Sequence, residues 1–132
     1  MTTSTVTRLT TAPAYAVLPA EDLSRARSFY GGTLGLEILD SPMGGQFFIH
    51  AGLGTKVMVY ERARTSAEHT ALTFVVDDLK SVVSELRSLG VVFEEYSLPG
   101  ITTVDGIAEM GDGYGAWFVD PEGNIINISQ MK

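Results

Sequence analysis

The same order of predicted elements occurs twice along the chain, and this duplication restricts the fold more than any other feature. Asp22, which opens a predicted helix, matches Asp78 at an offset of 56, and Gly54 matches Gly123 at an offset of 69. The larger offset reflects a longer loop around 99–105 in the second half. An internal repeat of this kind predicts two copies of one supersecondary unit.

Each copy is predicted to begin with one strand and one helix, which are followed by three strands in the first copy and by four short strand-like segments in the second. In the first copy, Glu21 and Asp22 precede apolar residues at helical spacing, and Gly31 and Gly32 end that run. The strand-like segments of the first copy are 14–20, 36–40, 46–51 and 56–61.

The second copy has the stronger helix signal. Apolar residues from Leu79 to Leu89 form one stripe, and Gly90 follows at the expected C-terminal stop. The expected strands are 69–76, 91–96, 106–110, 116–119 and 124–130. We therefore expect one α+β domain of tandem βαβββ modules, module one at about 12–61 and module two at about 69–132, joined by the polar segment 62–68.

Composition excludes several classes of site and partner. The chain has no cysteine, so disulfides and thiolate-bound metals are excluded. The net charge of −7 argues against nucleic acid, whose phosphates require clustered Lys and Arg. No apolar run approaches the ~18 residues of a membrane span, so we expect no membrane contact and a cytoplasmic location. The acidic balance favours a cationic small molecule or simply maintains solubility.

Three segments resemble the vicinal oxygen chelate superfamily of glyoxalases, bleomycin-resistance proteins and extradiol dioxygenases. They are 22–39, 74–94 and 116–130, and they contain FYGGTLGL, VDDL and DPEGN in this order. The resemblance implies a curved, half-open eight-stranded sheet around a cleft, with the helices outside. It also implies a homodimer with sites near the interface.

Metal-binding members of this superfamily place His and Glu ligands at corresponding positions of the two modules. By resemblance and by the internal repeat, those positions are here Tyr15, Met58, Ala71 and Asn127. Alanine has no donor atom, and a thioether is a poor ligand for the usual divalent ions. We therefore expect no metal at these positions and no cofactor. A site built from His50, His69 and a carboxylate such as Glu109 is a remaining alternative.

The residues expected to face the cleft suit a planar, partly aromatic ligand held by stacking and a few hydrogen bonds. The candidate ligand-binding residues are Tyr15, Phe48, His50, Met58, Tyr60, His69, Trp117 and Asn127. Alternatively, these side chains simply fill the hollow.

Two loops are long or distinctive enough to need a separate prediction. Segment 98–106 has the length and glycines of a movable cover, or it is a static connector. The turn Asp120–Asn124 is predicted to be a Pro-initiated hairpin whose acidic side chains face solvent.

The favoured function is metal-independent binding of a small molecule, as in the drug-sequestering members that the sequence resembles. One alternative is an enzyme of the lyase, isomerase or dioxygenase type. Such an enzyme would use a non-standard metal site, or Tyr15, His69 or Glu109 as an acid–base group. A third alternative is an interaction module whose cleft is vestigial.

Overall fold

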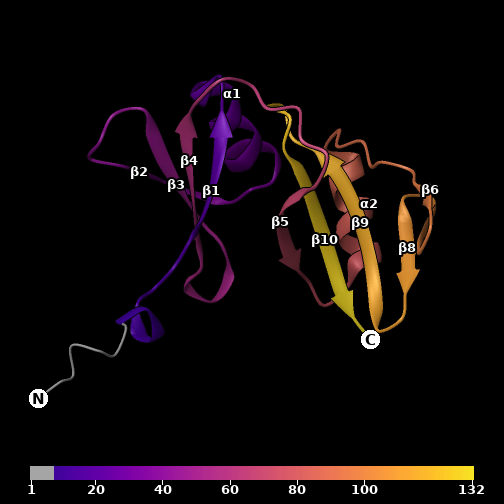
Figure 1. The fold of residues 1–132 in the computed structure, drawn as a ribbon. Helices are drawn as coiled ribbons and strands as arrows, with labels where there is room; N and C mark the ends of the chain where they lie inside the picture. The colour runs from indigo at the N-terminus through magenta and orange to yellow at the C-terminus, as the bar shows by residue number, and fades with distance from the viewer. Residues whose placement is uncertain (1–7) are drawn as a thin grey trace, which may run out of the picture.

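The computed structural model describes residues 8–132, which form two modules of helix and sheet joined by residues 62–69 (Figure 1). The elements of the first module are η2 (Arg8–Thr11), β1 (Ala16–Ala20), α1 (Leu23–Arg27), the π-helical turn η3 (Ser28–Thr33), β2 (Glu37–Asp40), β3 (Gln46–His50), η4 (Gly52–Gly54) and β4 (Lys56–Glu61). Those of the second are β5 (Thr70–Val75), α2 (Leu79–Ser88), β6 (Ser97–Leu98), β7 (Ile101–Val104), β8 (Ile107–Met110), β9 (Gly113–Val119) and β10 (Ile125–Met131).

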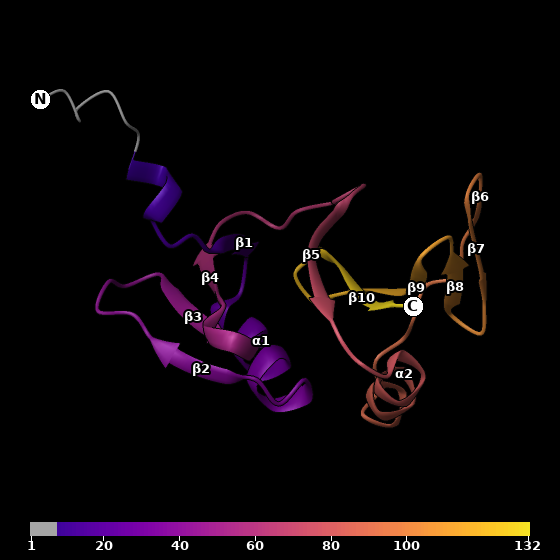
Figure 2. The same cartoon turned by 90° about the horizontal axis from the view of Figure 1, so that it is seen from below.

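Both modules share one sheet topology, so the predicted duplication and the α+β class are confirmed. The first sheet has the order β1-β4-β3-β2 and the second β5-β10-β9-β8-β7-β6. In each sheet the first strand pairs in parallel with the last, and the other pairs are antiparallel. Figure 2 shows α1 and α2 together in the lower part of the view, so the opposite side of each sheet is left without a helix.

The two helices begin in the same way, as the repeat predicts. Asp22 accepts a hydrogen bond from the backbone N–H of Arg25 at 3.0 Å, and Asp78 accepts one from Ser81 at 3.2 Å. These N-caps satisfy amide donors that the first turn of a helix leaves free. The predicted apolar stripe of the second helix buries Leu79, Val83 and Leu86 against its sheet. None of the helices in the described part of the chain is long and apolar enough to cross a membrane.

The second sheet has two more strands than the first because segment 97–104 forms a hairpin. Pro99 and Gly100 make its turn, with Gly100 at φ +82°, which fits a turn with proline first and glycine second. The segment 98–106, predicted to be a loop, is therefore largely strand. The predicted strand 91–96 is wrong in extent, since only Phe93 forms a bridge, with Phe118.

The prediction that the acidic side chains of the 120–124 turn face solvent is wrong. Asp120 is 2% exposed and Glu122 1% exposed. Glu122 accepts hydrogen bonds from the backbone amides of Glu21 and Asp22 and from the Arg25 guanidinium, whose Nε lies 2.6 Å away. The turn of the second module thus caps the helix of the first.

The same turn binds the first module at a second point. The Tyr30 hydroxyl donates to Asp120 Oδ2 at 2.5 Å, and the Asn124 amide donates to the carbonyl of Pro19 at 3.0 Å. Burial and the neighbouring Asp120 carboxylate raise the pKa of Tyr30, so its hydroxyl stays protonated and donates. Phe29 packs against Phe118 beside this network. The modules are held together by buried polar contacts as well as apolar ones.

Candidate functional site

The side of the first sheet opposite α1 is an open face rich in aromatic side chains. Phe47, Ile49, Val57 and Val59 are buried under the helix, so the residues that alternate with them point the other way. We call this side the first open face; its residues are Tyr15, Val17, Glu37, Leu39, Phe48, His50, Lys56, Met58 and Tyr60.

Aromatic rings and cations lie next to one another on the first open face. The Tyr15 and Phe48 rings make an edge contact with centroids 5.3 Å apart, and Met58 lies opposite Phe48 in the ladder. The Lys56 ammonium lies 5.6 Å from the Phe48 centroid, and the Arg62 guanidinium lies 5.9 Å from that of Tyr60. Tyr15 is 50% exposed, so a flat ligand can reach this part of the face.

His50 is oriented by a carboxylate on the neighbouring strand. Its Nδ1 lies 3.1 Å from Glu37 Oε1, which directs the proton of that nitrogen toward the carboxylate. The other ring nitrogen, Nε2, is buried without a hydrogen-bond partner in the part of the chain that the structure describes. A buried polar atom without a partner is costly, and such atoms are found where a ligand or water completes the structure.

The second sheet has an open face of its own, opposite α2, which is more tightly packed. We call it the second open face; its residues are Ala71, Thr73, Val75, Trp117, Val119, Ile125, Asn127 and Ser129. Trp117 is 8% exposed and meets the Tyr96 ring edge-on with centroids 5.5 Å apart. The Asn127 amide donates to the Ala116 carbonyl and accepts from the Ser129 hydroxyl, so its hydrogen-bonding groups are engaged within the sheet.

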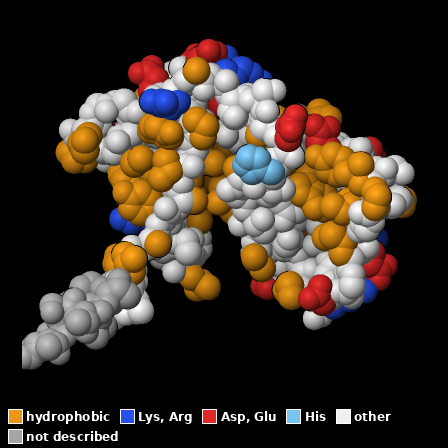
Figure 3. Space-filling model, in the orientation of Figure 1, with side chains coloured by type: hydrophobic (Ala, Val, Ile, Leu, Met, Phe, Trp, Pro, Cys, Tyr) orange, Lys and Arg blue, Asp and Glu red, His pale blue; other side chains and the backbone are white. Residues whose placement is uncertain are grey.

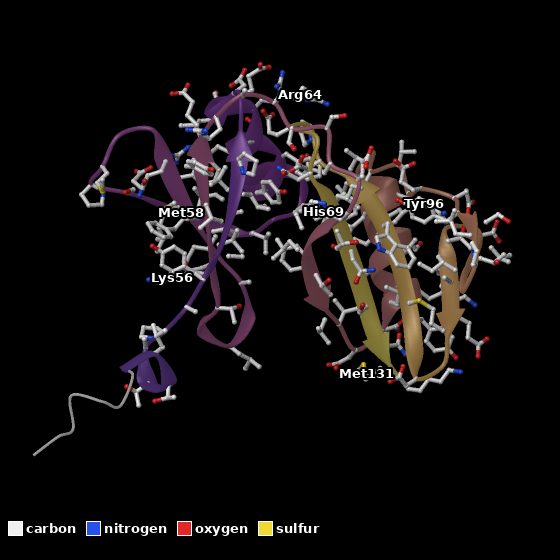
Figure 4. All side chains as sticks on the ribbon, viewed as in Figure 1. Lys56, Met58, Arg64, His69, Tyr96 and Met131 are labelled. Atoms are coloured by element: carbon white, nitrogen blue, oxygen red, sulfur yellow. The ribbon has the colours of Figure 1, made fainter. Side chains whose placement is uncertain are left out.

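A hollow of about 420 Å³ lies beside the second open face, where the linker crosses the end of the sheet. Its lining includes linker residues 64–67, Glu94, Tyr96 and Val119. Burial, followed by the Glu94 carboxylate, raises the pKa of Tyr96, so this hydroxyl remains a neutral donor at physiological pH. Figure 4 shows His69 and Tyr96 on the second module, and Lys56 and Met58 on the first.

The predicted binding residues therefore fall into two groups within one chain. Tyr15, Phe48, His50, Met58 and Tyr60 belong to the first open face, and Trp117 and Asn127 to the second, whereas His69 lies just before β5, where the linker enters the second module. Figure 3 shows two apolar areas separated by a pale strip with a histidine at its upper end. A groove of about 440 Å³ runs between β4 and β5 and is lined by residues of both modules.

The four positions expected for a metal are divided in the same way. Tyr15 and Met58 lie on the first sheet, and Ala71 and Asn127 lie on the second. They offer a phenol, a thioether, an amide and a methyl group, which do not fit a conventional divalent site.

The alternative site of His50, His69 and Glu109 is not assembled within one chain. His50 pairs with Glu37, and Glu109 Oε2 binds Lys132 Nζ at 2.6 Å. Between residues 8 and 132, no group of three or more His, Asp or Glu side chains is arranged to hold a metal.

Sequence reasoning missed Glu37 and Lys56 on the first open face and Tyr96, which packs against Trp117 of the second. Lys56 precedes Met58 by two residues, so strand alternation placed it on the same face and could have identified it. Glu37 required the register of β2 against β3, and Tyr96 lies in a segment without an equivalent in the first module.

Comparison with known proteins supports one family. The family model of the Glyoxalase/Bleomycin resistance protein/Dioxygenase superfamily matches residues 12–128. No curated protein matches the sequence significantly.

Solved structures of this fold resemble the chain along nearly its whole length. An antibiotic binding protein, TnmS3 from Streptomyces sp. CB03234, has 22% identity and a TM-score of 0.65, covering 92% of this chain and 98% of its own. A lactoylglutathione lyase from Agrobacterium tumefaciens has 22% identity and a TM-score of 0.64, covering 90% and 92%. The fosfomycin resistance protein FosX from Listeria monocytogenes has 15% identity and a TM-score of 0.66, covering 92% and 91%. At these identities the likeness establishes the fold and leaves the chemistry open.

Proposed function

Because the chain belongs to the Glyoxalase/Bleomycin resistance protein/Dioxygenase superfamily, we propose that it is a metal-independent small-molecule binding protein. Its ligand is partly aromatic and lies against the first open face. The proposal rests on the donor set Tyr15, Met58, Ala71 and Asn127 at the positions that the family resemblance and the internal repeat assign to metal ligands. The rings of Tyr15 and Phe48, which meet edge to face beside Met58, supply the kind of aromatic surface against which a flat ligand can pack.

The complete site is proposed to form in a homodimer. Strands β1 and β5 are the edge strands of their sheets at the side where the modules meet, and each has one unpaired edge. Exposed sheet edges favour pairing with another chain. On these strands Val17 is 46% exposed and Val75 is 71% exposed, so both edges offer apolar surface that a partner could cover. A two-fold arrangement would bring the first open face of one chain against the second open face of its partner.

Replacing Val75 with Lys is expected to weaken dimerisation, because a charge would be placed on the proposed contact strand β5. Analytical ultracentrifugation over a concentration series should give a dimer for the wild type and a shift toward monomer for the variant. Val104→Lys is the matched control, because Val104 is also 71% exposed but lies on the β6–β7 hairpin. A wild-type protein that stays monomeric at every concentration would refute the dimer.

Binding can be followed through Trp117, the only tryptophan in the chain. Trp117 lies on the second open face against Tyr96, so a ligand held between partner faces should change its emission. Titration with a library of basic, neutral and acidic aromatic compounds should reveal saturable binding, one ligand per site, with the compound recovered unchanged. The Trp117→Phe variant should lose the signal while calorimetry still detects binding.

If no compound in the library changes the emission or produces heat, the binding function is wrong. The second candidate, metal-free acid–base catalysis, is favoured by the His50–Glu37 pair, whose carboxylate orients the imidazole. Conversion of a bound compound, abolished by His50→Gln, would establish that alternative. A divalent ion found in the purified protein and lost in His50→Ala or His69→Ala would reject metal independence.

A further inference from the structure

The charge of the first open face differs in sign from that of the whole chain. The chain carries a net charge of −7, whereas this face and its end carry Lys56, Arg62 and one carboxylate, that of Glu37. Glu37 is already engaged with His50. Neither Lys56 nor Arg62 forms an ion pair with any residue between 8 and 132. The negative net charge of the chain therefore does not describe the electrostatic field at the first open face.

Lys56 has a special position among these groups. It is the only charged residue in the lining of the 440 Å³ groove between β4 and β5, where the other described lining residues are apolar, glycine or threonine. Its ammonium lies over the Phe48 ring, next to Tyr15 and Met58. Lys56 is exposed, so an ion pair that it forms with a ligand is partly screened by water and contributes modestly.

His50 adds a second polar group at the same end of the face. It is directly opposite Lys56 in the ladder between β3 and β4, so the two side chains are neighbours on one side of the sheet. Its Nε2 is buried and has no partner within the described residues. In the tautomer whose Nδ1 proton points to Glu37, Nε2 is an acceptor, so it would pair with a donor group of the ligand and not with its acidic oxygen.

We propose that the ligand of the first open face is an aromatic compound with an acidic oxygen, a carboxylate or a phenolate, whose charge pairs with Lys56 while its ring lies over Phe48 and Met58. This inference rests on the proposed binding function and adds the chemical class of the ligand. It reverses the expectation of a cationic ligand, which was based on net charge alone. The charges nearest to the aromatic rings, those of Lys56 and Arg62, would repel a cation.

The proposal can be tested with four probes that share one ring system. They are 2-naphthoate and 2-naphthylacetate as anions, 2-naphthamide as the neutral compound and 2-naphthylmethylammonium as the cation, all of which have these charges at pH 7 while Lys56 is protonated. Calorimetry on the wild-type protein, at a pH where each probe has the stated charge, measures their dissociation constants. We expect the anions to bind about five- to tenfold more tightly than the amide, as for one partly screened ion pair, and the cation to bind most weakly.

Lys56→Met should remove the preference for the anions while leaving the affinity for 2-naphthamide nearly unchanged, since the methylene stem and its packing are largely kept. Lys56→Arg should retain the preference. Lys80→Met is the control, because Lys80 lies on the exposed side of α2, away from the first open face.

The outcomes separate this inference from the function on which it rests. If the amide binds but the anions bind no better, or if Lys56→Met weakens all four probes equally, the ligand class is wrong and the binding function stands. If no probe binds to the wild type, the proposed binding of aromatic ligands fails, and the ligand class fails with it.

Discussion

The Glu122→Ala variant is expected to lose about 3 kcal/mol of unfolding free energy, because a buried carboxylate with several donors is removed from the module boundary. Glu122 is 1% exposed and accepts from two backbone amides at the start of α1 and from Nε and Nη2 of Arg25. The Arg25 side chain is 45% exposed and can recover some hydration, which keeps the loss below that of a fully buried ion pair. Urea unfolding at one protein concentration, followed by circular dichroism, measures the change.

The contribution of Glu122 should also depend on pH. The hydrogen bond from Arg25 lowers the pKa of Glu122 in the folded protein, with further help from the Asp22 amide. A carboxyl group whose folded pKa is depressed stabilises the protein above its unfolded pKa of about 4.3, and the effect fades as the pH falls below it. The stability gap between the wild type and Glu122→Gln should therefore be full at pH 7 and narrow progressively below about pH 4.

Glu61→Ala is the matched control, because Glu61 is exposed at the end of β4. Its unfolding free energy should stay within about 0.5 kcal/mol of the wild type. If Glu122→Ala and Glu61→Ala unfold at the same urea concentration, then Glu122 does not hold the modules together. A stability gap that is independent of pH would show that its charge is not involved.

The fold could be predicted from the sequence to the extent that it depends on local pattern and repetition. An offset of 69 carries β4 onto β10 and β3 onto the end of β9, and an offset of 56 carries one helix N-cap onto the other. These features follow from strand alternation and from capping residues, both of which are encoded within a few positions.

The contacts between modules could not be predicted in this way. Glu122 and Asp120 have the appearance of turn residues, and their partners are 90 to 101 positions away in sequence. A turn pattern indicates backbone conformation and does not indicate what later covers the turn. The burial of these carboxylates depends on how α1 and η3 lie against the turn between β9 and β10, which the repeat leaves undetermined.

Only part of the candidate site could be predicted from the sequence. Alternation placed Phe48, Met58 and Tyr60 on one face correctly, but the distance between the two faces depends on module packing. Net charge alone does not give the charge of the proposed site, because most acidic residues lie away from the first open face and Lys56 lies on it. Local charge, and not the total, determines which ligand a surface attracts.

The second large effect is expected for Gly123→Ala, which should lower the free energy of unfolding by about 3 kcal/mol or more through backbone strain and a direct clash. Gly123 has φ +91°, a conformation that residues with a Cβ rarely adopt. A Cβ there would also collide with the carbonyl oxygen of Thr65 in the linker. The linker therefore passes over the 120–124 turn so closely that only glycine fits beneath it.

The duplication supplies the controls that separate these two causes. Gly54 is the equivalent of Gly123 in the first module and has φ +75°, but a Cβ there meets nothing within 4 Å. Gly54→Ala should therefore lower the free energy of unfolding only by the backbone strain, about 1 kcal/mol. Gly111 has neither a positive φ nor a close neighbour, so Gly111→Ala should be neutral or slightly stabilising.

The order of the three variants tests how the linker joins the modules. If the linker is fixed against the turn, urea unfolding should rank Gly123→Ala well below Gly54→Ala and place Gly111→Ala near the wild type. If the linker can move away at little cost, the variants at the two equivalent glycines should lose the same free energy. That equality would mean that residues 62–69 are a passive connection, and that the contacts of Glu122 and Asp120 alone set the relative position of the two modules.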